Sequence, residues 1–208
     1  SSSTCNIHNS LDNMFNSLYL DNFRLKHEGD YRIFLQNPRG IKEFRDNDPE
    51  YFPTMVALKE GQCDLMCFSE TNVAWHRNDF LYDISIANKN IWDTPTKTIA
   101  ASCRSEKHSS SYYQPGGVLN IVANNLTTKI QSTSADFLGR WSKIRFFAKN
   151  GAVAIYTVYR PNPSTLASAG ANSSWMQQYR YLSKNNSSVD PRAQLIDDLI
   201  IEIQREQN

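Results

Sequence analysis

The 208-residue chain is 40% hydrophobic and 12% aromatic, and its formal net charge is +1. This apolar content indicates a packed globular core and argues against a disordered chain, and the near-neutral charge provides no global basic field for a polyanionic partner. No run of about 18 apolar residues occurs, and the first residues lack the charged and apolar regions of a signal peptide. We therefore expect an intracellular protein with no membrane segment.

The four cysteines are predicted to be reduced thiols, because a chain of this length folds without disulfides. Cys63 and Cys67 stand four residues apart, but no second Cys or His pair at zinc-ligand spacing lies nearby. We interpret both as small apolar residues of a buried strand.

The first half of the chain begins with a polar tail, residues 1–30, in which an apolar cluster at 14–20 predicts a short helix. Strand and helix patterns then alternate. The strand patterns lie at 31–37, 63–69 and 96–103, and the helical patterns lie at 49–60, which Gly61 is expected to end, and at 76–93.

The second half is dense in strand patterns before two helices follow. The strand-like runs lie at 116–124, 127–133, 141–148 and 152–162, and the helical patterns lie at 175–182 and 190–206. Asp190 is expected to cap the last helix, with Pro191 at its first position. Helices between and after the strands predict an α/β sandwich with mixed sheets, formed by one domain over residues 31–208.

The apolar run before Glu70 ends on a carboxylate, which is unusual for a buried strand. A buried charge without a partner is strongly unfavourable. Glu70 is therefore expected to face a cation or a substrate group. The alternatives are that it caps a helix or pairs with Arg77.

Four short motifs fall at strand ends in a fixed order. They are Asn37 in LQNPRG, Glu70 in CFSETN, the pair Gly116–Gly117 in QPGGVLNIV, and VYRPN at 158–162. Together they resemble the endonuclease/exonuclease/phosphatase superfamily, and most closely the endonucleases of retroelements and their apurinic-endonuclease relatives. The resemblance implies a DNase I-like four-layer α/β sandwich with mixed, largely antiparallel sheets.

The resemblance also implies roles for individual residues. Glu70 would bind the catalytic Mg²⁺, with Mn²⁺ as an alternative, and Asn37, Tyr159 and Asn162 would act at the scissile phosphate. A hard cation held by carboxylate oxygen stabilises the charge that develops in phosphodiester hydrolysis, and amides bind phosphate without adding repulsive charge. The implied partner is DNA or another phosphodiester, in a gene that also encodes a reverse transcriptase. The alternatives are a turn role for Asn37 and a core role for Tyr159.

Two motifs of the superfamily do not occur in this sequence. They are an Asp-x-Asn after a strand and an Asp-His pair that serves the attacking water, and His76 and His108 do not occupy the place of the family's catalytic histidine. The helix at 190–206 is where the Asp-x-Asn strand would follow. We therefore expect residues 31–208 to be an incomplete domain that is inactive alone. The alternative hypothesis is a non-catalytic remnant or nucleic-acid-binding module.

Overall fold

The computed structural model describes residues 26–41, 51–104, 112–164, 172–184 and 190–206. The helix predicted at 14–20 and the cysteine at position 5 lie outside these residues. None of the described helices is both long enough and apolar enough to cross a membrane.

The first sheet contains four strands in the order β1-β2-β4-β3. β1 and β2 are parallel, and the other pairs are antiparallel. The bounds of the strands are Ile33–Gln36 for β1, Leu65–Ser69 for β2, Thr96–Ala101 for β3 and Val118–Ala123 for β4.

The second sheet is antiparallel, with β5 (Ile130–Ala135), β6 (Trp141–Ala148) and β7 (Gly151–Val158) in that order. The predicted start of β5 at residue 127 is wrong. The strand begins at Ile130, because a 3-10 helix, η1 (Asn124–Lys129), occupies the residues before it. The Thr127 hydroxyl donates to the carbonyl of Asn124 at 2.7 Å, which favours the tight turn over an extended strand.

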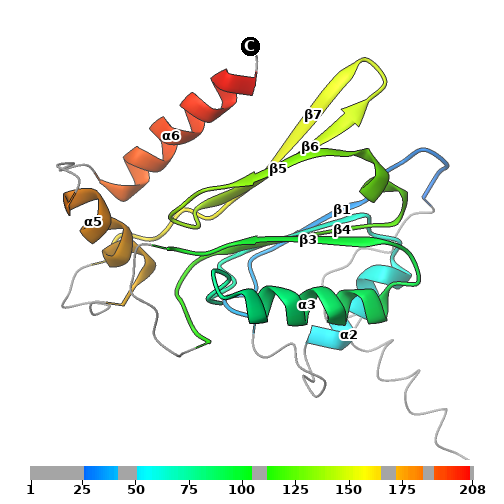
Figure 1. The fold of residues 1–208 in the computed structure, drawn as a ribbon, viewed down its shortest axis with the longest axis horizontal. Helices are drawn as coiled ribbons and strands as arrows, with labels where there is room; N and C mark the ends of the chain where they lie inside the picture. The colour runs from blue at the N-terminus through cyan, green and yellow to red at the C-terminus, as the bar shows by residue number, and fades with distance from the viewer. Residues whose placement is uncertain (1–25, 42–50, 105–111, 165–171, 185–189, 207–208) are drawn as a thin grey trace, which may run out of the picture.

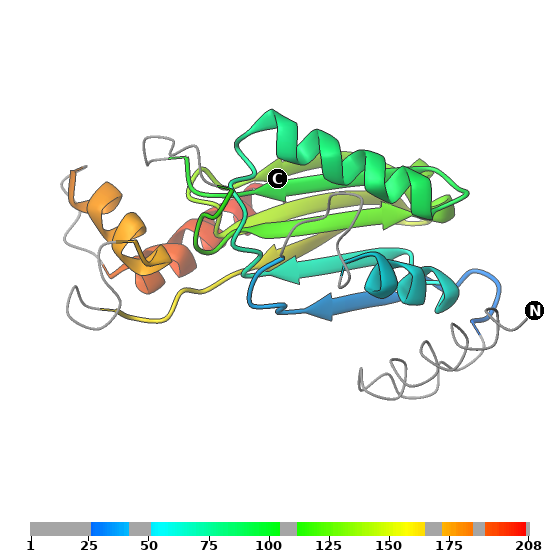
Figure 2. The same cartoon turned by 90° about the horizontal axis from the view of Figure 1, so that it is seen from below.

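Helices cover the outer faces of the two stacked sheets (Figure 1). Helices α2 (Tyr51–Glu60) and α3 (Asn78–Ile91) lie on the first sheet, α3 along β3 and α2 beside β1 and β2 (Figure 2). Helix α6 (Pro191–Glu206) lies beyond the second sheet, and α5 (Ser174–Lys184) lies at one end of the sandwich. The predicted four-layer α/β sandwich with mixed, largely antiparallel sheets is confirmed.

Strand β2 is buried on both faces, which explains its continuous apolar run. Met66 and Phe68 pack toward the helices, whereas Leu65 and Cys67 pack between the two sheets. All four are at most 3% exposed. Burial of each large apolar side chain contributes about 1.5–3 kcal/mol, so β2 is the central strand of both cores.

A buried polar contact fixes the second sheet over the first. The Asn120 side chain of β4 donates to the Ser142 hydroxyl of β6 at 2.8 Å and accepts from the Thr157 hydroxyl of β7 at 2.6 Å. All three residues are at most 2% exposed. Satisfied buried polar groups specify a single arrangement, so these bonds determine where β7 ends relative to β4.

The inner face of β1 is not covered in the described part of the chain. β7 contacts β2 and β4, and β5 contacts β3. Phe34 packs on Phe68 on the helical side, with 5.9 Å between ring centroids. Ile33 and Leu35, on the opposite face, are 53% and 71% exposed. β1 is therefore an edge strand with one buried face.

Helix α6 is held on the second sheet largely by ion pairs. Lys143 of β6 is buried, and its ammonium group lies 2.7 Å from Glu202 and 2.5 Å from Glu206. Leu195 is also buried, but Ile203 on the predicted apolar stripe is 44% exposed. Apolar packing of α6 is thus confined to its first turns.

The ends of the helices match the sequence predictions only in part. Asp190 caps α6 as predicted, with its carboxylate 2.6 Å from the backbone nitrogen of Arg192. Helix α2 ends at Glu60, directly before Gly61, as predicted. The left-handed residue that follows is Gln62 and not Gly61, with a φ angle of 55°. The amide of Cys63 then donates to the carbonyl of Leu58 at 2.9 Å, which completes a Schellman motif.

Candidate active site

One edge of the sandwich collects the ends of β1, β2, β3 and β7 and the start of β4. The parallel register pairs Gln36 with Phe68, and the antiparallel register pairs Ser69 with Val118. Residues that follow β1 and β2 and residues that precede β4 must therefore lie side by side.

Asn37 and Glu70 meet at this edge. The Asn37 amide nitrogen donates to the Glu70 carboxylate at 2.8 Å, and the Asn37 amide oxygen accepts from the backbone nitrogen of Arg39 at 2.9 Å. These two bonds fix the amide orientation. Within the described ranges no hydrogen bond engages the other carboxylate oxygen of half-buried Glu70. The predicted pairing of Glu70 with Arg77 is wrong, because Arg77 pairs with Asp79 at 2.8 Å.

The backbone at this edge is strained. Arg39, Glu70 and Asn72 have φ angles of 54°, 56° and 55°, in the left-handed region that non-glycine residues rarely adopt. Strained residues persist where the surroundings hold them, often at functional sites. Here the amide of Thr71 donates to the carbonyl of Gly117 at 3.3 Å, which contributes to holding the turn.

Asn72 joins this turn to the loop before β4. Its backbone nitrogen donates to the carbonyl of Gly116 at 2.7 Å, and its side-chain oxygen accepts from the Gly116 nitrogen at 2.8 Å. Its carbonyl accepts from the Gln114 nitrogen at 3.2 Å. The sequence analysis did not assign Asn72 a role. The tolerance of asparagine for left-handed backbone was the only local signal for it.

Because Gly116 and Gly117 have no side chains, neighbouring residues can approach their backbone closely and both can adopt positive φ angles. Their φ angles are 86° and 84°. A Cβ on Gly116 would lie 2.7 Å from the Ser174 hydroxyl and 3.0 Å from the Tyr159 ring, and one on Gly117 would lie 3.0 Å from the Thr71 hydroxyl. No larger residue fits at either position without displacing the site.

Tyr159 follows β7 and lies against Gly116. Its backbone nitrogen donates to the carbonyl of Arg140 at 2.7 Å. Burial raises the pKa of Tyr159 to about 12, with further contributions from the charges of Glu70 and Tyr113. The hydroxyl is therefore protonated at neutral pH and can donate a hydrogen bond.

Asn162 has no hydrogen bond to any residue that the structure describes. It is exposed and follows buried Pro161. The edge thus joins Asn37 to Glu70 by a hydrogen bond and holds Tyr159 against Gly116, and the role of Asn162 stays a prediction.

A metal ion at this edge would find few protein ligands. The described residues contain no group of three His, Cys, Asp or Glu side chains that could hold an ion. Glu70 offers one carboxylate oxygen that accepts no hydrogen bond from the residues the structure describes, whereas Asn37 uses its amide oxygen on Arg39. Mg²⁺ is commonly bound by one or two carboxylates and keeps several waters. The donor set therefore fits a Mg²⁺ ion that retains most of its hydration shell.

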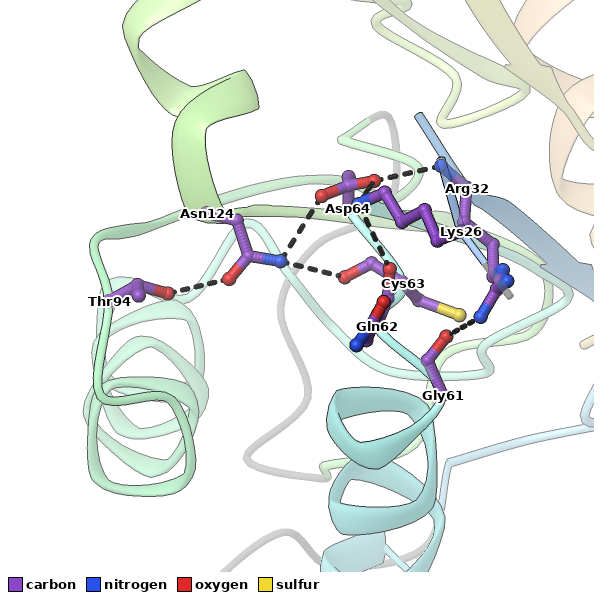
Figure 3. A network of polar contacts seen from close by, with 8 residues as sticks. All are labelled: Lys26, Arg32, Gly61, Gln62, Cys63, Asp64, Thr94 and Asn124. Atoms are coloured by element: carbon purple, nitrogen blue, oxygen red, sulfur yellow. Dashed lines mark hydrogen bonds and ion pairs between the residues drawn. The ribbon is translucent and has the colours of Figure 1, made fainter. Parts of the chain in front are cut away.

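A second polar network lies at the opposite edge (Figure 3). Asp64 is 2% exposed, and its carboxylate accepts from the Lys26 ammonium at 2.5 Å, the Arg32 backbone nitrogen at 2.8 Å and the Asn124 amide at 3.2 Å. An open cleft of about 830 Å³ borders this network and contains none of the predicted site residues. Because Asp64 is fully engaged, we interpret the network as structural.

The chain was compared with protein families, curated proteins and solved structures. No protein-family model matches the sequence, and no curated protein matches it. Among solved structures, an endonuclease/exonuclease/phosphatase family protein from Leptotrichia buccalis C-1013-b is similar over 77% of this chain, with a TM-score of 0.44 and 13% sequence identity. This chain covers 64% of the length of that protein. The neighbour belongs to the superfamily whose motifs the sequence resembles, but likeness at this level carries no argument about catalytic residues.

Proposed function

We propose that the edge formed by Asn37, Glu70, Gly116–Gly117 and Tyr159 is a phosphodiester site for Mg²⁺-dependent hydrolysis, of the kind found in nucleic-acid endonucleases of retroelements. The observation that carries the proposal is the hydrogen bond of 2.8 Å between Asn37 and Glu70, which come from strand ends 33 residues apart in the sequence. Mn²⁺ is the alternative cation. The nucleic-acid substrate and a reverse transcriptase in the same gene rest on motif resemblance.

Each residue has a role that its surroundings support. A bound Mg²⁺ would act as a Lewis acid toward a phosphoryl oxygen. Glu70 would hold the ion through its free oxygen, and Asn37 would keep that carboxylate oriented. The neutral Tyr159 hydroxyl would donate to a non-bridging phosphate oxygen. Asn162, which is exposed after β7, would contact the substrate only after the substrate has bound.

None of these residues is proposed as the general base that activates the attacking water. The 208 residues contain neither the Asp-x-Asn nor the Asp-His motif, and general acid-base assistance contributes about 10²–10⁴-fold to the rate. We propose that this segment alone binds metal weakly and does not turn over phosphodiesters. A second candidate function is a non-catalytic nucleic-acid-binding module. It is favoured because the described residues contain no group of three His, Cys, Asp or Glu side chains that could hold an ion.

A nicking assay with supercoiled plasmid and Mg²⁺ tests the proposal. The proteins compared are this segment, the segment joined to a C-terminal region that carries both missing motifs, and Glu70→Gln in each. The matched control is Glu60→Gln, which changes an exposed glutamate at the other end of the sheet. Only the extended protein should nick, and Glu70→Gln alone should abolish it. Nicking that survives Glu70→Gln would refute the metal role of Glu70.

A further inference from the structure

Three exposed arginines follow strands at the same edge as Glu70. Arg39 lies after β1, Arg104 after β3 and Arg160 after β7. We infer that these edge arginines bind the phosphates that flank the scissile phosphate, so that the site takes a nucleic-acid strand of several nucleotides in preference to a small phosphoester. The inference deepens the proposed function and rests on it.

The backbone at or beside each edge arginine is held in place. The nitrogen of Arg39 donates to the Asn37 side chain at 2.9 Å, and the nitrogen of Arg104 donates to the carbonyl of Phe137 at 3.1 Å. Arg160 stands between Tyr159, whose nitrogen is hydrogen-bonded, and buried Pro161. The backbone from which each side chain extends is therefore held, so binding has to order the arginine side chains but not the loops.

The edge arginines have no acidic partner among the residues that the structure describes. Two other arginines that the structure describes are engaged in ion pairs. Arg140 lies 2.6 Å from both Asp136 and Asp198, and Arg145 pairs with Glu206. An exposed guanidinium without an internal partner retains its full capacity for bidentate phosphate binding. The edge arginines therefore carry positive charge that no acidic residue in the described part of the chain neutralises.

The spacing of the strands matches a chain of phosphates. The order β1-β2-β4-β3 places Arg39 and Arg104 three strand intervals apart, on opposite sides of Glu70, and at about 4.8 Å per interval this is about 14 Å. Arg160 comes from the second sheet, at a layer distance of about 10 Å. One strand of a duplex rises about 3.4 Å per nucleotide, so 14 Å corresponds to about four nucleotides.

This distance distinguishes the two classes of substrate. A strand that crosses the edge can place one phosphate at Glu70 and others near Arg39 and Arg104 together. A single phosphoester at Glu70 would require the side chains of Arg39 and Arg104 to converge on one point from strand ends about 14 Å apart, whereas a strand of several nucleotides offers each arginine its own phosphate.

Anisotropy of a labelled 20-nucleotide single-stranded DNA, measured in EDTA over a salt series, tests the inference. Each Arg→Ala change should reduce the slope of log K against log salt by about 0.7, which corresponds to about fivefold weaker binding at 0.1 M salt. Arg→Lys changes at the same positions should keep most of the slope. The matched control is Arg205→Ala, which removes a 74% exposed arginine on α6 and should leave the slope unchanged.

Binding in EDTA separates this inference from the proposed function. In EDTA, Glu70→Gln should bind the DNA at least as tightly as the unmodified chain does, because it removes a negative charge beside the phosphates, even if Mg²⁺-dependent nicking is never observed. An unchanged slope after all three Arg→Ala changes, or an equal loss in Arg205→Ala, would overturn the inference. Competition by a single-phosphate ester as effective as that by the oligonucleotide would overturn it as well.

Discussion

Replacement of Asn72 by alanine should destabilise the site edge by about 2–5 kcal/mol. The Asn72 side chain accepts from the half-buried Gly116 nitrogen at 2.8 Å, and loss of that acceptor leaves a donor unsatisfied, at a cost of about 1–3 kcal/mol. Asn72 also has a φ of 55°, and a left-handed backbone costs alanine about 1–2 kcal/mol. The two costs together give the expected loss.

Two companion variants separate these contributions. Asn72→Gly should remove the hydrogen bond and tolerate the left-handed backbone, so its loss should be smaller than that of Asn72→Ala by about 1 kcal/mol. Asn72→Asp retains an acceptor and should cost the least. Urea denaturation measures the free energy of unfolding, and hydrogen exchange of the Gly116 amide reports the local bond. A loss below about 0.5 kcal/mol in Asn72→Ala, with unchanged exchange, would refute the role of Asn72 as the link between the two loops.

Three further results are expected. Tyr159 should ionise near pH 12 in an absorbance titration. The free energy of unfolding should fall as the pH rises from about 10 to 12, because the folded state retains a proton that the unfolded state loses. A Tyr159→Phe variant with the same fall would contradict this. Burial raises the pKa of Cys63 to about 11, so its alkylation at pH 8 should require unfolding, and reaction as fast as that of a free thiol would be inconsistent with the buried strand. Leu65→Ala, at a fully buried site, should lower the free energy of unfolding by about 2–5 kcal/mol. Leu35→Ala, at a 71% exposed site, should lower it by about 0.5 kcal/mol or less in the same urea assay. Similar losses in the two variants would contradict the uncovered face of β1.

The sequence analysis predicted the elements in which local pattern and tertiary environment agree. The apolar run of β2 is continuous because both faces are buried, and its end on Glu70 is readable from the chain. The start of β5 was missed because threonine hydroxyls, such as that of Thr127, stabilise a turn in residues that favour strands. The end of α2 at Glu60 was predictable, but the left-handed position after it falls on Gln62, which carries no left-handed preference, and not on Gly61.

The candidate site was predictable only where its residues end strands. Asn37 and Glu70 meet because parallel neighbours end at one edge, which strand patterns can indicate. Asn72 and Gly116 are 44 residues apart, and their pairing depends on a register that the sequence does not display. Asn162 lies four residues beyond β7, so no strand register places it.

Anomalous diffraction from crystals soaked in Mn²⁺ tests the central claim most directly. The free oxygen of Glu70 should coordinate the ion at about 2.0–2.3 Å, with water as most of the remaining ligands, and the Asn37 hydrogen bond to Glu70 should persist. The peak should be lost in Glu70→Gln and kept in Glu60→Gln. An anomalous peak at the opposite edge beside Asp64, with none at Glu70 under saturating Mn²⁺, would contradict the proposal that this edge is a metal-dependent phosphodiester site.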